Sequence, residues 1–232
     1  MLTFESQCHI GTLQTLLLNP EQILDDASRI PRNHNDPLLR IARPTWVARD
    51  YQVGGVLLLG MNPAGGTSSH QQISYPSDRG LADAIDQMVR KRDLVSYRYW
   101  RDVAQPKAME TWRIWKVSIK GILHSLAAGG ITSNQIAFGN LMPFRSEGNS
   151  VTASEFVRAW NSDLSHVITL LKPQLIVKMS ASFPSFQKYV ARIEILPFRR
   201  GIGDGAITSL GRTDLDNIRK WAETCLIPTQ TG

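Results

Sequence analysis

Two kinds of segment alternate along the chain: short runs of apolar residues, and longer stretches in which apolar residues recur at helical spacing. Apolar runs of roughly 4–8 residues are typical of strands buried on both faces of a parallel sheet. Such runs predict four strands, at residues 55–60, 135–140, 174–179 and 192–196. Helical spacing predicts helices at residues 12–18, 20–28, 81–92, 111–126, 152–172, 186–190 and 213–225. This alternation predicts a three-layer α/β/α sandwich around a central four-stranded, mostly parallel sheet.

Local signals mark the ends of some of these helices. Thr152 and Glu155 have the spacing of a capping box, which predicts a helix beginning there. Gly129 and Gly130 follow a predicted helix, as glycine commonly does. Residues between about 93 and 110 are predicted to connect two helices. No linker or repeat interrupts the chain, so we expect a single domain over residues 1–232, with residues 80–128 as a helical, basic elaboration.

The first predicted strand ends in a turn, Gly60-Met61-Asn62-Pro63, followed by Gly65-Gly66. In open α/β folds, ligands bind at the carboxyl ends of the strands, and glycine lets the backbone approach them closely. Pro63 restricts Asn62 towards extended backbone, which would hold its amide in place. The turn therefore predicts a polar group that holds a water or binds a base, with a purely structural turn as the alternative.

The second predicted strand ends at Asn140, in the sequence Asn140-Leu141-Met142-Pro143-Phe144. Because parallel strands end at the same edge of a sheet, we expect Asn140 to lie near the Gly60–Pro63 turn. The sequence therefore predicts one site at this edge.

Net charge suggests a polyanionic partner, since the chain carries +6 at neutral pH. Its basic residues concentrate between positions 90 and 120, at Arg90, Lys91, Arg92, Arg98, Arg101, Lys107, Arg113, Lys116 and Lys120. Aromatic residues interleave with them, at Tyr97, Tyr99, Trp100, Trp112 and Trp115, as suits stacked bases. Helical spacing assigns Trp112 and Trp115 to the core instead. We expect nucleic acid at this segment, with a solvated helical face as the alternative.

Several classes of site and location are disfavoured by the sequence. Cys8 and Cys225 are the only cysteines, and the five histidines lack the spacing of metal ligands, so we expect no metal and no disulfide framework. Neither phosphate-binding glycine motifs nor a Gly-x-Ser-x-Gly elbow follows a strand, and we expect no cofactor. No stretch of roughly 18 apolar residues and no secretion signal is present, which predicts a cytoplasmic protein without a membrane partner.

Together, the two strand ends resemble those of the uracil-DNA glycosylase superfamily. The closest similarity is to its single-strand-selective monofunctional and mismatch-specific branches, whose first motif reads Gly-x-Asn-Pro-Gly and whose second strand ends in Asn followed by Pro. The order of elements is similar over roughly residues 54 to 225. This resemblance implies a four-stranded parallel sheet between helices, DNA as partner, single or double stranded, and hydrolysis of the N-glycosidic bond of uracil or another modified base.

The resemblance also implies roles for individual residues. Asn62 would orient the attacking water, and the backbone of Met61 and Pro63 would line the base pocket. Asn140 would read the pyrimidine edge of an extruded base, and Tyr75 would stack on it. The cations expected to contact DNA are Arg90, Lys91, Arg92, Arg98, Arg101, Arg199 and Arg200.

Two departures from the family pattern keep other functions open. The superfamily places a His-Pro-Ser-like motif after the fourth strand, whereas this chain reads Leu196-Pro197-Phe198-Arg199-Arg200. Arg199 or Arg200 is the candidate substitute for the missing histidine charge. Ala64 stands where the first motif usually has glycine, which puts the identity of the base in doubt. The alternatives are a non-catalytic nucleic-acid binder and an enzyme acting on a small nucleotide.

Overall fold

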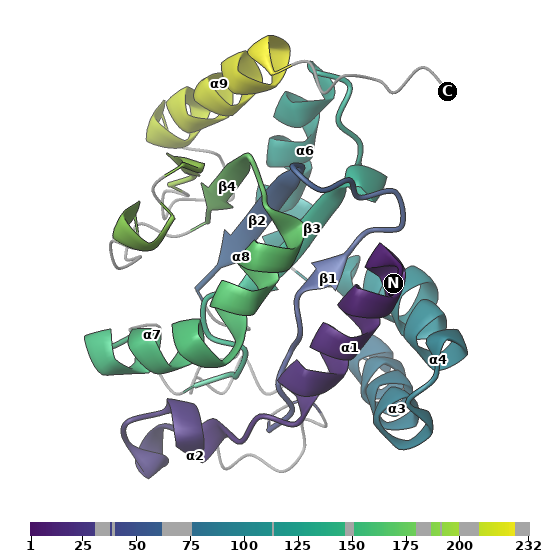
Figure 1. Ribbon diagram of the computed structural model, residues 1–232. Helices are drawn as coiled ribbons and strands as arrows, with labels where there is room; N and C mark the ends of the chain where they lie inside the picture. The colour runs from purple at the N-terminus through teal and green to yellow at the C-terminus, as the bar shows by residue number, and fades with distance from the viewer. Residues whose placement is uncertain are drawn as a thin grey trace.

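The computed structural model describes residues 1–30, 38, 40–61, 76–112, 114–146, 151–179, 187–190, 192–199 and 209–225. Within these residues, five strands form one sheet in the order β1-β3-β2-β4-β5 (Figure 1). The strands are β1 (Trp46–Val47), β2 (Val56–Gly60), β3 (Ile136–Asn140), β4 (Leu175–Lys178) and β5 (Glu194–Pro197). β1 pairs antiparallel with β3, and the other pairs are parallel. The predicted mixed α/β class with a mostly parallel sheet is confirmed.

The prediction of four strands was one strand short, because β1 extends the sheet at the β3 edge. A strand of two residues is too short to produce a recognisable apolar pattern. Its approach to β3 depends on Gly139, since a Cβ at that position would lie 2.5 Å from Oγ1 of Thr45. A side chain on residue 139 would therefore push β1 away from the sheet.

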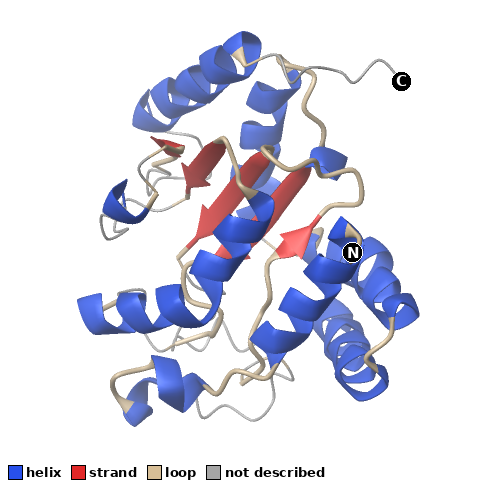
Figure 2. Cartoon of the chain, viewed as in Figure 1, coloured by secondary structure: helices blue, strands red, loops and turns tan. Residues whose placement is uncertain are grey.

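The helices are α1 (Phe4–Leu16), α2 (Pro20–Ile23), α3 (Pro76–Lys91), α4 (Leu94–Tyr99), α5 (Gln105–Met109), α6 (Lys120–Ala127), α7 (Ala153–Ala159), α8 (Ser165–Leu171) and α9 (Ser209–Thr224). π-helical segments cover Trp100–Ala104, Trp115–Ile119 and Trp160–Leu164. Short 3₁₀ turns cover Ala27–Arg29, Ser133–Gln135 and Gln187–Tyr189. Figure 2 shows the helices surrounding the central strands, and α8 crosses in front of β2 and β3. No helix in the described part of the chain is both long and apolar enough to cross a membrane.

Buried side chains explain the position of the central strands. Val56, Leu57, Leu58 and Leu59 of β2 are fully buried, as expected for the middle of a parallel sheet covered on both faces. On β3, Phe138 packs edge-on against Trp115, with ring centroids 6.2 Å apart. This contact holds the segment before α6 against the sheet. The apolar core is therefore centred on β2 and β3.

The predicted capping box is confirmed at the start of α7. The backbone N–H of Thr152 donates to Oε2 of Glu155 at 2.8 Å, and the Glu155 N–H donates to Oγ1 of Thr152 at 3.3 Å. Glu155 is fully buried and also accepts hydrogen bonds from the Asp25 N–H and from Arg29. The same carboxylate thus caps α7 and holds the N-terminal segment against it.

The predicted connection at residues 93–110 was wrong, because this segment is mostly helical. Asp93 caps α4 by accepting a hydrogen bond from the Ser96 N–H at 2.7 Å. The chain then continues through the π-helical segment into α5, which carries Pro106 in its first turn. Tyr97 of α4 and Trp100 of the π-helical segment are buried, so packing against the core stabilises this helical region.

Candidate functional site

The ends of β2 and β3 lie side by side at the carboxyl edge of the sheet, as their sequences predict. Gly60 and Asn140 are partners in the parallel register. Pairing continues beyond the strands, because the Leu141 N–H donates to the Gly60 carbonyl at 2.8 Å and the Met142 N–H donates to the Met61 carbonyl at 2.9 Å. The start of the first predicted motif is thus fixed directly against the second.

The Asn140 side chain lies over the backbone of Gly60. A Cβ on residue 60 would lie 2.6 Å from Oδ1 of Asn140, closer than real side chains approach. Asn140 is half-buried, and no hydrogen bond from the described part of the chain reaches its amide. The absence of a side chain on Gly60 therefore leaves room for a polar amide whose donor and acceptor are both available to a ligand.

Other predicted residues of this edge fall partly beyond the described residues. Asn62, Pro63, Tyr75 and Arg200 lie outside them. Met61 is described: its side chain is buried in the core, and its carbonyl is occupied by the pairing with Met142. Of the residues predicted to bind the base, the structure therefore brings together Met61 and Asn140.

Two arginines near the end of β3, Arg43 and Arg145, were not predicted from the sequence. The Arg43 N–H donates to the Pro143 carbonyl at 2.7 Å, and its guanidinium carbon lies 5.0 Å from the centre of the Trp112 ring. Arg145 is partly buried, and loss of water lowers the pKa of its guanidinium. The only sequence signal was their position, since Arg145 closely follows the Asn140 motif. Both add positive charge near the segment that follows β3.

The end of β5 holds Arg199 in a fixed position. Asp214 of α9 is buried and accepts three hydrogen bonds from Arg199: from the backbone N–H at 2.7 Å, from Nη2 at 2.8 Å and from Nε at 3.1 Å. These bonds raise the pKa of the guanidinium. Phe198 is buried and Leu196 packs partly buried against the core, so the segment compared with the His-Pro-Ser-like motif presents apolar side chains.

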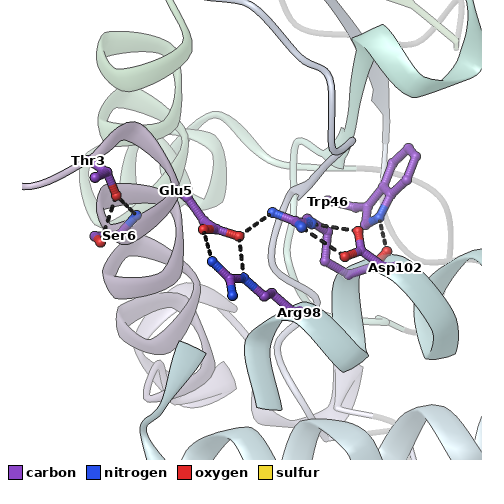
Figure 3. A network of polar contacts seen from close by, with 7 residues as sticks. Thr3, Glu5, Ser6, Trp46, Arg98 and Asp102 are labelled. Carbon is purple, nitrogen blue, oxygen red and sulfur yellow. Dashed lines mark hydrogen bonds and ion pairs between the residues drawn. The ribbon is translucent and has the colours of Figure 1, made fainter. Parts of the chain in front are cut away.

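In the basic segment, Arg101 lies inside the protein instead of on the surface. Its guanidinium donates to Glu5 of α1 at 2.9 Å and to Asp102 at 2.7 and 2.8 Å (Figure 3). Its carbonyl accepts a hydrogen bond from Nε1 of Trp46 at 2.8 Å. Only 7% of Arg101 is exposed. Arg101 thus connects α1, β1 and the helical insertion formed by residues 80–128. Because its side chain is buried, it does not belong to a DNA-binding surface.

The other cations of this segment predicted to bind DNA, Arg90, Lys91, Arg92 and Arg98, are exposed. Arg98 donates twice to Glu5, at 2.7 and 2.9 Å, and these bonds lower the pKa of that carboxyl to about 2. Arg90 pairs with Asp86 one turn earlier in α3. Lys91 and Arg92 are exposed and form no ion pair within the described residues. The positive surface of this segment is therefore smaller than its sequence suggests.

The aromatic residues of the basic segment are mostly core residues. Tyr97 and Trp100 are buried, which contradicts the expectation that they stack on bases. Trp112 and Trp115 pack against the core as their helical spacing predicts. Tyr99 is 50% exposed and is the one of these five rings that faces solvent substantially.

No family model and no curated protein matches this sequence. Among the described residues, no group of three or more His, Cys, Asp or Glu side chains could hold a metal ion. The geometry of the carboxyl edge therefore carries the functional inference.

Proposed function

We propose that this chain is a DNA glycosylase that hydrolyses the N-glycosidic bond of uracil or another modified base. The observation that carries the proposal is the Asn140 amide, placed over Gly60 at the carboxyl edge of a parallel sheet. In open parallel sheets, this edge is the usual ligand-binding position. The Gly60–Met61 backbone leads from there directly into Asn62 and Pro63 of the first motif.

The chemistry of an amide suits the edge of a pyrimidine. Uracil presents a carbonyl oxygen beside a ring N–H, and the Asn140 amide offers one donor and one acceptor to this pair. A nucleotide extruded from the DNA stack would expose this edge to the side chain. Asn140 would therefore select the base.

Bond cleavage requires a positioned water more than a strong base. The sugar becomes strongly electrophilic as the base departs, so a water held in line is sufficient for attack. Asn62, expected directly after the β2 strand, would hold that water. Positive charge from Arg43 and Arg145, near the end of β3, would favour the anionic leaving base.

A second candidate function is non-catalytic recognition of a base in nucleic acid. It is favoured by Leu196, an apolar residue packed against the core that stands where the resemblance expects a histidine assisting the leaving base. The nearby Arg199 is held by Asp214, which offsets its charge. A protein with this arrangement would bind an extruded base without releasing it.

A base-release assay tests the proposal. Oligonucleotides carrying uracil, hypoxanthine, xanthine or a mismatched pyrimidine are incubated with the protein as single strands and as duplexes. Asn140→Asp replaces the amide donor by a carboxylate of the same shape, and we expect release to slow by about 10- to 100-fold. Asn134→Asp, an exposed asparagine in the turn before β3, is the matched control.

The outcomes separate the two candidates. Release that is slowed by Asn140→Asp and unaffected by Asn134→Asp supports the glycosylase. DNA binding without release from any substrate supports the non-catalytic reader. Neither release nor binding would reject both.

A further inference from the structure

Arg199 is held along one side of its guanidinium and open on the other. Asp214 engages the backbone N–H, Nε and Nη2, while Nη1 has no acceptor among the described residues. The Arg199 side chain is 43% exposed, whereas that of Asp214 is fully buried. The carboxylate therefore fixes the orientation of an arginine that still presents donors to solvent.

The position of Arg199 places these donors at the carboxyl edge. Arg199 follows Phe198, whose N–H donates to the Lys178 carbonyl at 2.7 Å and so continues the pairing of β5 with β4. Lys178 ends β4 in register with Pro197, and no ion pair in the described part of the chain holds its ammonium group. Two cations thus occupy adjacent strand ends on the β5 side of the site.

We propose that Arg199 binds a backbone phosphate of the DNA beside the extruded nucleotide, and that Asp214 is the positioning residue that orients it. This inference rests on the proposed function and assigns the DNA chain to the β4–β5 end of the edge. A guanidinium with one side fixed loses little freedom when its other side binds a phosphate. Asp214 contributes by holding the guanidinium without covering Nη1.

The alternative for this pair is a purely structural link between β5 and α9. A second arginine–carboxylate pair on α9 serves as the matched control: Arg219 donates through Nε to Glu223 at 2.9 Å. Arg219 is exposed and belongs to the middle of the helix, away from the strand end. Loss of charge at residue 219 therefore reproduces the change in net charge without the proposed contact.

Salt dependence of DNA binding is the test. Fluorescence anisotropy with a uracil-containing single strand gives Kd over a series of NaCl concentrations for the wild type and the Arg199→Gln, Arg199→Lys and Arg219→Gln variants. We expect Arg199→Gln to weaken binding on the order of tenfold and to reduce the slope of log K against log salt by about 0.7, the value of one phosphate contact. Arg199→Lys should keep the slope and weaken binding less, and Arg219→Gln should match the wild type.

The role of Asp214 is tested by a double-mutant cycle. Asp214→Asn should weaken DNA binding in the wild type and have no further effect in the Arg199→Gln variant, with folding of each monitored by circular dichroism. Equal effects in both backgrounds would show that Asp214 acts only on the fold. A wild-type slope in Arg199→Gln would overturn the phosphate contact, whereas the proposed function is decided separately by base release from the wild type. A wild type that binds no DNA would overturn the proposed function together with this inference.

Discussion

At the scale of single residues, two glycines in neighbouring strands have different tasks. Gly139 makes room for Thr45, a buried residue beside β1, whereas Gly60 makes room for the flexible end of the half-buried Asn140 side chain. A methyl group at residue 139 would meet Oγ1, Cγ2 and Cβ of Thr45, so it must displace that residue as a whole. A methyl group at residue 60 needs only to displace an amide, so the two positions separate the fold from the site.

Substitution of each glycine by alanine should give opposite results. Gly60→Ala moves the Asn140 amide, and we expect base release to fall by at least about tenfold with a change in unfolding free energy below about 1 kcal/mol. Gly139→Ala should cost about 1–3 kcal/mol, because it overpacks the contact with Thr45. Urea unfolding and base release are measured on both variants. A Gly60→Ala variant with full activity would show that the position of the Asn140 amide does not matter.

Asp163 is a buried carboxyl between two helical segments. Oγ1 of Thr15 lies 2.6 Å from its Oδ1 and 3.1 Å from the Gly11 carbonyl. The Thr15 hydroxyl donates to Oδ1 of Asp163, and this hydrogen bond partly offsets the effect of burial on the pKa of the carboxyl. Burial raises the pKa of Asp163 from 3.8 to about 6.

This pKa predicts how stability depends on pH. The folded state keeps a proton that the unfolded state has released, so the unfolding free energy falls as the pH rises from about 4 to about 6 and then levels off. Asp163→Asn removes this pH-dependent loss. Above pH 7, the unfolding free energy of the variant should therefore exceed that of the wild type by about 1–3 kcal/mol. The exposed Asp216→Asn is the control, and unfolding is followed in urea at several pH values. Parallel curves for Asp163→Asn and the wild type would contradict the raised pKa.

At the scale of elements, the helical insertion between β2 and β3 is held to α1 by ion pairs. Arg101 is buried between Glu5 and Asp102, and its guanidinium lies 5.4 Å from the centre of the Tyr97 ring. The charges of this segment, read from sequence as a nucleic-acid surface, thus belong partly to its internal support. Sequence spacing could not separate the two, because a buried arginine and an exposed one look alike without their partners.

Removal of Arg101 should weaken the attachment of the insertion. Arg101→Ala leaves two carboxylates close together without their shared cation, and we expect a loss of about 2–4 kcal/mol in unfolding free energy. Arg90→Ala breaks an exposed pair on α3 and should cost less than about 1 kcal/mol. Both values come from urea denaturation. Equal costs for the two variants would mean that Arg101 contributes no more than a surface pair.

At the scale of the whole molecule, sequence patterns predicted the sheet better than its surroundings. The runs at β2, β3 and β4 are buried on both faces, which makes their patterns unambiguous, and parallel topology then brings Gly60 beside Asn140. β1 was missed because two residues carry no pattern. The helices at residues 93–110 were missed because tertiary packing stabilises them. Arg43 and Asp214 were missed because their positions depend on contacts with Pro143 and Arg199, which are distant in sequence.

The most direct test of the account is the rate of uracil release from a single-stranded oligonucleotide, measured under single-turnover conditions for the wild type and for Asn62→Ala. We expect the wild type to release uracil and Asn62→Ala to release it at least about 100-fold more slowly. DNA affinity should stay within about twofold, since the amide positions a water and binds little of the DNA. Release at the wild-type rate by Asn62→Ala, or no release by the wild type, would contradict the account.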